Sequence, residues 1–157
     1  MRNMLGWTKN WNYIIRNVIF KDHELKRLMK IPKTTGVIQF TERYFIKAGF
    51  TNQLLTDEVS RIVYSDTQGA PTDVPNVRRN MLVFDIYVKN DEQRGVSDDG
   101  LILRSDLIAD RLDKLLRRER YLADTGYRFV PAGDVDLGTR TAGYSRHTIS
   151  YYYMKVY

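Results

Sequence analysis

The stretch 80–89 constrains the fold of this chain more than any other, because its side chains alternate over its whole length. In an extended strand, successive side chains point to opposite sides. One face would carry four apolar residues: Leu82, Phe84, Ile86 and Val88. The other face would carry Met81, Val83, Asp85, Tyr87 and Lys89. Since both faces are largely apolar, the pattern predicts a strand in the middle of a sheet and not at its edge.

A helix is predicted to follow at residues 100–118, after a polar loop. At about 100° per residue, one stripe of this helix is mostly apolar. The stripe consists of Leu101, Ser105, Ile108, Leu112, Leu115 and Leu116. A strand covered by the helix that follows it is the smallest unit that buries a core. We therefore expect the rest of the chain to be arranged around residues 80–118.

The remaining periodicities predict an α+β fold. Helices are expected at 8–20, capped by Thr8, and at 23–30, capped by Asp22. Residues 36–50 read as strand or helix, with a strand favoured over 43–48. Further strands are expected at 58–65, 127–131 with a continuation at 134–137, and 144–156, with a long connection at 66–76. The expected architecture is a mixed, mostly antiparallel sheet of four to five strands with helices packed on one face.

Length and composition predict one globular domain. The chain has 157 residues, 43% of them hydrophobic, which suits a single core. We expect a helical segment at 1–31 and a sheet with its long helix over 43–157. The absence of cysteine excludes disulfides, zinc–thiolate sites and thiol nucleophiles. No apolar run is long enough to span a membrane, and the first residues lack the apolar core of a signal peptide.

No constellation typical of an enzyme is present. His23 and His147 stand alone, outside any metal-ligand spacing, and no phosphate-binding glycine motif occurs. The pairs Asp98-Asp99 and Asp134/Asp136 fit a helix cap or a turn better than a cation site. For Asp85, pairing with an arginine such as Arg61 is favoured over a role as a base. The sequence therefore predicts a protein that is not an enzyme and has no cofactor or metal.

Interaction surfaces give stronger signals. Leu103 and Leu107 would lie roughly 140–180° from the core stripe, on a face that is otherwise charged: Arg104, Asp110, Arg111 and Lys114. Trp7 and Trp11 lie near the N-terminus, and tryptophan is enriched in binding hot spots. We interpret these four residues as a candidate subunit interface. The alternative is contact within the same chain.

Basic residues exceed acidic ones by 25 to 19, which gives a net charge of +6. Five arginines are candidates for contact with a partner or with DNA in a channel: Arg78, Arg79, Arg94, Arg140 and Arg146. Four tyrosines also crowd the last seven residues. Tyrosines on a strand with arginines nearby can stack bases, so a single-stranded nucleic-acid-binding module is a second possible function.

Three stretches resemble the small neck proteins of tailed bacteriophages, the tail terminator and tail-completion (head-to-tail joining) group. The first is Arg61-Ile-Val-Tyr-Ser followed by Pro75-Asn-Val-Arg-Arg-Asn. The second is Leu82-Val-Phe-Asp-Ile-Tyr-Val-Lys with the following turn and helix. The third is Gly126-Tyr-Arg-Phe with Gly143-Tyr-Ser-Arg-His and the aromatic last strand. The resemblance covers most of the chain from about Tyr44 onward.

The resemblance implies a structural virion protein that forms a homo-oligomeric ring, hexameric in that family, around a DNA channel. Such a ring would cap the tail tube and join it to the head connector. It would assemble in the host cytoplasm and reside in the virion neck. By position, loops 66–79 and 90–99 would contact tube or connector, and the face with Leu103 and Leu107 would pack in the ring. These expectations rest on analogy at the level of fold.

Overall fold

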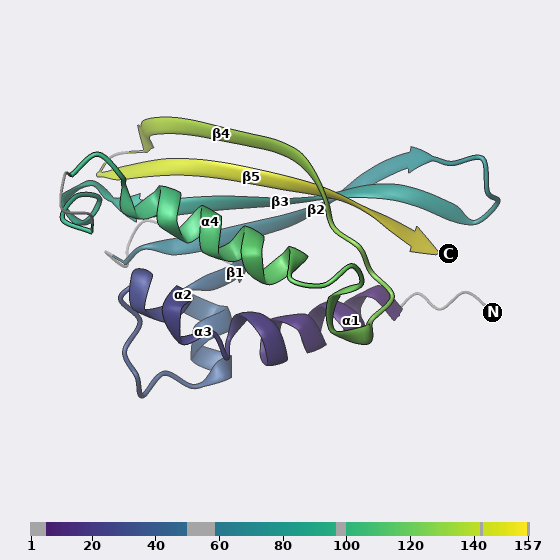
Figure 1. Cartoon of the computed structure of the whole chain (residues 1–157), viewed down its shortest axis with the longest axis horizontal. Coiled ribbons are helices and arrows are strands. Elements are labelled where there is room, and N and C mark those ends of the chain that lie inside the picture. The colour runs from purple at the N-terminus through teal and green to yellow at the C-terminus, as the bar shows by residue number, and fades with distance from the viewer. Residues whose placement is uncertain (1–5, 50–58, 97–99, 142, 157) are drawn as a thin grey trace.

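The structure, a computed structural model, describes residues 6–49, 59–96, 100–141 and 143–156. Five strands form one sheet in the order β1-β2-β3-β5-β4, with β1 parallel to β2 and the other neighbours antiparallel. The strands are β1 (Phe45–Lys47), β2 (Arg61–Pro71), β3 (Val77–Lys89), β4 (Val130–Thr141) and β5 (Tyr144–Val156). The helices are α1 (Gly6–Ile14), α2 (His23–Leu28), α3 (Val37–Arg43) and α4 (Arg104–Arg117). The predicted α+β class with a mixed, mostly antiparallel sheet is confirmed (Figure 1).

The strand β3 is the centre of this sheet, as its alternation predicted. It pairs with β2 on one side and with β5 along its whole length on the other. Leu82, Phe84, Ile86 and Val88 are fully buried, whereas the odd-numbered residues between them are half-buried. The buried residues belong to one hydrophobic cluster that also includes residues of α1 and α4. This even-numbered side of β3 is the inner face of the sheet, and the odd-numbered side is its outer face.

The first helix begins at Gly6, before the predicted cap Thr8, and continues into a π-helical turn, Ile15–Ile19. It packs on the inner face through aromatic rings. The ring of Trp7 stacks on Tyr153 at 4.1 Å, and the ring of Trp11 lies 6.0 Å from Phe84. Offset-stacked and tilted rings at such distances add to the free energy of area burial. The aromatic contacts therefore fix the N-terminal helix to the central strands.

The second helix begins where the sequence predicted, because Asp22 is its N-cap. The Asp22 carboxylate accepts a hydrogen bond from the Leu25 backbone N–H at 2.8 Å. The same carboxylate accepts two hydrogen bonds from the guanidinium of Arg111 on α4, at 2.5 and 2.9 Å. Burial of the carboxylate opposes ionisation, but the bonds from Arg111 and Leu25 outweigh it, so the pKa of Asp22 is lowered. One side chain thus caps α2 and ties it to α4.

The ambiguous stretch 36–50 contains both kinds of structure. Residues Val37–Arg43 form α3, and Phe45–Lys47 form the short parallel edge strand β1. The strand favoured over 43–48 is therefore right only for its central three residues. Phe40 of α3 is fully buried and stacks on Phe45 at 5.8 Å. Tertiary packing thus overrides the strand propensity of this segment.

The long helix is shorter than predicted, because α4 begins at Arg104 and not at residue 100. Leu101 precedes the helix and is 78% exposed, so its place on the core stripe was wrong. Arg104, the first residue of α4, is buried and does not lie on the charged outer face that was predicted. Its guanidinium donates to the carbonyl oxygens of Leu28 and Glu92 at 2.8 Å each. The predicted cap at 97–99 lies outside the described residues. Instead, Asp106 accepts from the Leu103 backbone N–H at 3.2 Å, which closes the first turn.

The connection expected at 66–76 is largely strand. Residues to Pro71 belong to β2 and residues from Val77 to β3, so the two strands form an arm that extends beyond the helices (Figure 1). The pairing shifts register between Thr67 and Ala70. At Gly69 a Cβ atom would lie 1.4 Å from the carbonyl oxygen of Arg79, so only glycine fits this close approach.

A buried polar residue, Asn80, lies at the base of the arm. Its amide contacts the carboxylate of Asp66 and the hydroxyl of Tyr153, both at 3.5 Å, and its carbonyl oxygen accepts from the Gly69 N–H at 3.3 Å. The Tyr153 hydroxyl also donates to Asp66. Polar groups of three strands therefore satisfy one another at the edge of the core.

The last two strands run almost without interruption. β4 continues through Pro131 and Gly133 with three register shifts, where the sequence predicted a break. β5 spans the predicted 144–156. Among the described residues, no helix is long and apolar enough to cross a membrane.

We expect Asp22→Asn to lower the free energy of unfolding by about 1 kcal/mol, because asparagine keeps the cap but loses the ion pair with Arg111. Asp22→Ala should cost about 2 kcal/mol, since both are lost. A carboxylate with a lowered pKa stabilises the fold above its unfolded pKa. The difference between Asp22→Asn and wild type should therefore shrink as pH falls below the ordinary value of 3.8. Urea unfolding at several pH values measures this.

The matched control is Glu24→Gln, which removes an exposed ion pair with Arg27 on the same helix. It should leave stability unchanged. If Asp22→Asn behaves like this control at neutral pH, the Asp22–Arg111 pair does not stabilise the packing of α2 against α4.

Candidate functional site

Trp7 and Trp11, predicted as interface residues, lie in the core of the same chain. Trp11 is only 4% exposed, and the two indole rings stack at 5.6 Å. Both rings also contact Phe129, which precedes β4. Their position near the N-terminus suggested a binding surface, but there the two tryptophans pack α1 onto the sheet. The alternative, contact within the chain, holds for both tryptophans.

Leu103 and Leu107 do not form the predicted outer pair one turn apart. Leu103 is the N-cap residue, with extended backbone, so it is not on the helix. Leu107 is half-buried and packs against the hydrophobic core. The helical-wheel placement failed because it assumed that the helix begins at residue 100. Contact of either leucine with a second subunit remains a prediction.

The candidate DNA-contact arginines are not one patch. Arg78 and Arg79 are consecutive in β3 and point to opposite faces of the sheet. Arg146, in β5, shares the outer face with Arg79, but the two are about 26 Å apart along the strands. Arg94 is exposed and donates to the carbonyl oxygen of Gly100 at 3.2 Å. Arg140 lies in β4, and its side chain is outside the described part of the structure.

Asp85 has a hydrogen-bond partner that was not predicted, Thr148. Its carboxylate accepts from the hydroxyl of Thr148 on β5 at 2.6 Å. Arg146, on the same strand as Thr148, bonds to Tyr87, and this bond raises the pKa of the guanidinium. The carboxylate is therefore part of a polar row on the outer face, and its pairing with Arg61 stays a prediction.

An acidic groove of about 630 Å³ lies between α4 and the strands β4 and β5. Its carboxylates come from α4 and β4, and its floor from β5. The lining includes Asp106, Asp110, Asp113, Arg117, Asp134 and His147. Four carboxylates against one guanidinium make this groove locally negative, although the chain as a whole is basic. The groove therefore repels phosphate and attracts cations.

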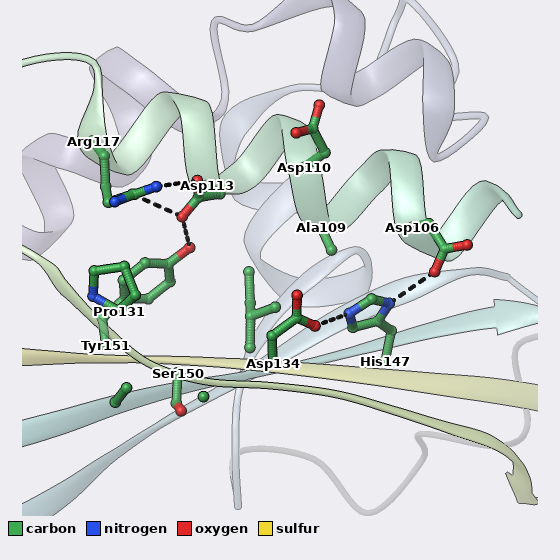
Figure 2. A pocket seen from close by; sticks show the side chains of 13 residues that line it. Asp106, Ala109, Asp110, Asp113, Arg117, Pro131, Asp134, His147, Ser150 and Tyr151 are labelled. Carbon is green, nitrogen blue, oxygen red and sulfur yellow. Dashed lines mark hydrogen bonds and ion pairs between the residues drawn. The ribbon is translucent and has the colours of Figure 1, made fainter. Parts of the chain in front are cut away.

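One end of the groove is held by Tyr151. Its hydroxyl donates to a carboxylate oxygen of Asp113 at 2.6 Å, and Arg117 binds both oxygens of that carboxylate at 2.9 and 3.0 Å (Figure 2). Burial of the phenol raises the pKa of Tyr151, and the bond to Asp113 raises it further. These three groups join the last turns of α4 to the central part of β5.

The other end, two helical turns away, is built on His147. Its Nδ1 lies 3.1 Å from an oxygen of Asp106, and its Nε2 lies 2.5 Å from an oxygen of Asp134 (Figure 2). Asp136 is paired with His147 in the sheet. Asp106, Asp136 and His147 each present a ligand atom within 4.8 Å of the others. Three carboxylates and a buried imidazole thus meet at the start of α4.

From the sequence, His147 was expected to stand alone, and the Asp134/Asp136 pair was expected to form a cap or turn. They meet because β4 and β5 pair in one register and α4 crosses above them. Two signals in the sequence point this way. Asp134 and Asp136 alternate onto one face of a strand, and Asp106 stands in the first turn of the helix.

No model of a protein family matches the chain, and no curated protein matches it. The resemblance to phage neck proteins therefore stays a prediction from the residues that carry it.

We expect Tyr151→Phe to lower the free energy of unfolding by about 1.5–3 kcal/mol at neutral pH, since the ring stays but its bond to a charged carboxylate is lost. A raised phenol pKa stabilises the folded state below the unfolded pKa of 10.0 and loses this effect as pH rises above it. Wild-type stability should therefore fall above about pH 10, and less steeply in Tyr151→Phe. Denaturant unfolding across alkaline pH measures both effects.

Tyr13→Phe is the matched control, because it removes a hydroxyl from a half-exposed ring on α1. It should change stability by no more than about 0.5 kcal/mol. Equal stability of Tyr151→Phe and Tyr13→Phe would show that the bond between Tyr151 and Asp113 does not stabilise the groove.

Proposed function

We propose that this protein is a structural subunit of a homo-oligomeric ring at the head–tail junction of a tailed bacteriophage, as the sequence resemblance implies. In this role it caps the tail tube and joins it to the head connector. The observation that carries the proposal is a pair of exposed apolar patches at opposite ends of α4. A ring formed by head-to-tail contacts needs two different, complementary patches on each subunit.

The first patch, the leading patch, consists of Leu101 and Ile102, immediately before α4. Their exposed fractions are 78% and 45%. Exposed aliphatic side chains placed next to each other are typical of contact surfaces.

The second patch, the trailing patch, consists of Tyr121, Val130 and Met154, each about half exposed. These residues line a concavity of about 520 Å³ together with Arg79 and Arg128. Tyr121 follows the end of α4, and Met154 lies near the end of β5. Because α4 runs along the length of the molecule, the two patches lie toward opposite ends of it (Figure 1). They differ in shape and composition, as a heterologous interface requires.

Two further features support the neck position. The β2–β3 arm extends beyond the helices, and half-exposed Val74 lies at its turn, so a projection is available to reach a neighbouring ring or tube. The net charge of +6 favours passage of DNA past the ring without sequence readout.

A single-stranded nucleic-acid-binding module is the second candidate. The guanidinium of Arg79 lies 4.7 Å from the ring of Tyr152, beside the concavity that Arg128 also lines. Such a cation–aromatic pair is a platform on which a base can stack. However, Tyr151 and Tyr153 are buried, so most of the tyrosine-rich strand faces the core. A monomer that binds single-stranded DNA with steep salt dependence would favour this function over the ring.

We expect wild-type protein at high concentration, or with tail tubes, to form rings that light scattering and electron microscopy detect. Leu101→Glu and Met154→Glu should each abolish ring formation, because each places a charge in one patch. Each variant keeps the other patch intact. A mixture of the two variants should therefore form dimers, which light scattering distinguishes from rings and monomers.

Ile38→Glu is the matched control, since Ile38 is 66% exposed on α3, away from both patches. It should assemble like wild type. Circular dichroism checks that every variant is folded. Assembly by Leu101→Glu or Met154→Glu would contradict the two-patch interface, and a strict monomer under all conditions would contradict the ring.

A further inference from the structure

We propose that Asp106, Asp136 and His147 form a binding site for one divalent transition-metal ion. The site lies at the end of the acidic groove where α4 begins. It does not depend on ring assembly, and a metal-binding result says nothing for or against the ring.

The spacing of the ligand atoms fits a metal. Metal–nitrogen and metal–oxygen bonds to imidazole and carboxylate are about 2.0–2.2 Å, so neighbouring ligand atoms on one ion lie about 3 Å apart. Nδ1 of His147 and Oδ1 of Asp106 are 3.1 Å apart. A ligand oxygen of Asp136 lies within 4.8 Å of both partners. A small movement of the exposed Asp136 side chain brings all three ligand atoms within bonding distance of one ion.

Asp134 sets the orientation of the imidazole. Its carboxylate oxygen lies 2.5 Å from Nε2 of His147, and the tautomer with its proton on Nε2 donates a hydrogen bond to this oxygen. In neutral histidine the other nitrogen then has a free lone pair, and this lone pair faces Asp106. A carboxylate that holds the second nitrogen of a ligand histidine is the usual outer partner in metal sites.

This arrangement requires a positive charge between Nδ1 and Asp106. A lone pair and a carboxylate oxygen at 3.1 Å repel each other unless a cation lies between them. His147 is only 7% exposed, so water screens the repulsion poorly. The guanidinium that lines the groove, Arg117, is bound to Asp113 two helical turns away. The cation is therefore either a proton on His147 or a metal ion, and the additional carboxylate of Asp136 favours the metal.

The donor set indicates the class of metal. One imidazole nitrogen and two carboxylate oxygens suit borderline ions such as Zn²⁺, Co²⁺ and Mn²⁺. Mg²⁺ and Ca²⁺ prefer oxygen ligands alone. Three protein ligands leave further positions for water, which the open groove supplies.

The test uses the full chain without an affinity tag, stripped of metal with a chelator and titrated with ZnCl₂ in a calorimeter. We expect one Zn²⁺ per chain. The melting temperature should rise with free Zn²⁺, because the ion binds the folded state. Asp134→Asn should weaken binding about 10- to 100-fold, since the orienting carboxylate is lost. His147→Gln and Asp136→Asn should weaken it further.

Two matched controls, His23→Gln and Asp110→Asn, remove the other histidine and an exposed groove-lining carboxylate. Both should bind Zn²⁺ like wild type. Asp136→Asn changes an exposed side chain, so it tests the site even if His147→Gln fails to fold. The proposal is wrong if wild type takes up no Zn²⁺, if only Mg²⁺ binds, or if Asp136→Asn and Asp110→Asn bind Zn²⁺ equally well.

Discussion

The pairing of β3 on both of its sides is the constraint on which the rest of the structure depends. Its partners β2 and β5 are aligned only through it, and its buried side chains form the middle of the inner face. The rings of Trp7 and Trp11 and the apolar stripe of α4 complete the core above that face. A strand paired on both edges leaves no backbone group for solvent, which suits its nearly continuous apolar sequence.

The sequence predicted those elements whose side chains repeat clearly at the period of a strand or a helix. The alternation of 80–89, the cap at Asp22 and the last strand could all be read directly. The start of α4 could not, because Leu101 continues the apolar spacing although the chain is not yet helical there. The choice between strand and helix for 36–50 stayed open in the sequence, and in the structure Phe40 of α3 is buried in the core. The cluster at His147 was missed because the partners of a strand residue depend on register, and no local pattern encodes the register of β4 against β5.

The two proposals meet at the start of α4, because the leading patch precedes the helix and Asp106 lies in its first turn. Its ends adjoin the two apolar patches, and one side borders the acidic groove. Carboxylates gather at the groove, whereas the basic excess is spread over the rest of the chain. A helix that packs on the core with one side and lines the groove with another tolerates few substitutions on those two sides. The ion pair between Asp22 and Arg111 also holds α4 against α2.

The buried amide of Asn80 has a consequence for how the long strands find their partners. A slip of two residues between β3 and a neighbour would keep every apolar side chain on its original face, so hydrophobicity alone does not forbid it. The slip would instead leave the buried polar groups of Asn80 and Tyr153 without their hydrogen bonds, which is costly. Asn80 therefore selects one register of β3 among several that would bury the same apolar side chains. For the extended β2–β3 hairpin, this selection disfavours pairings that are shifted by two residues.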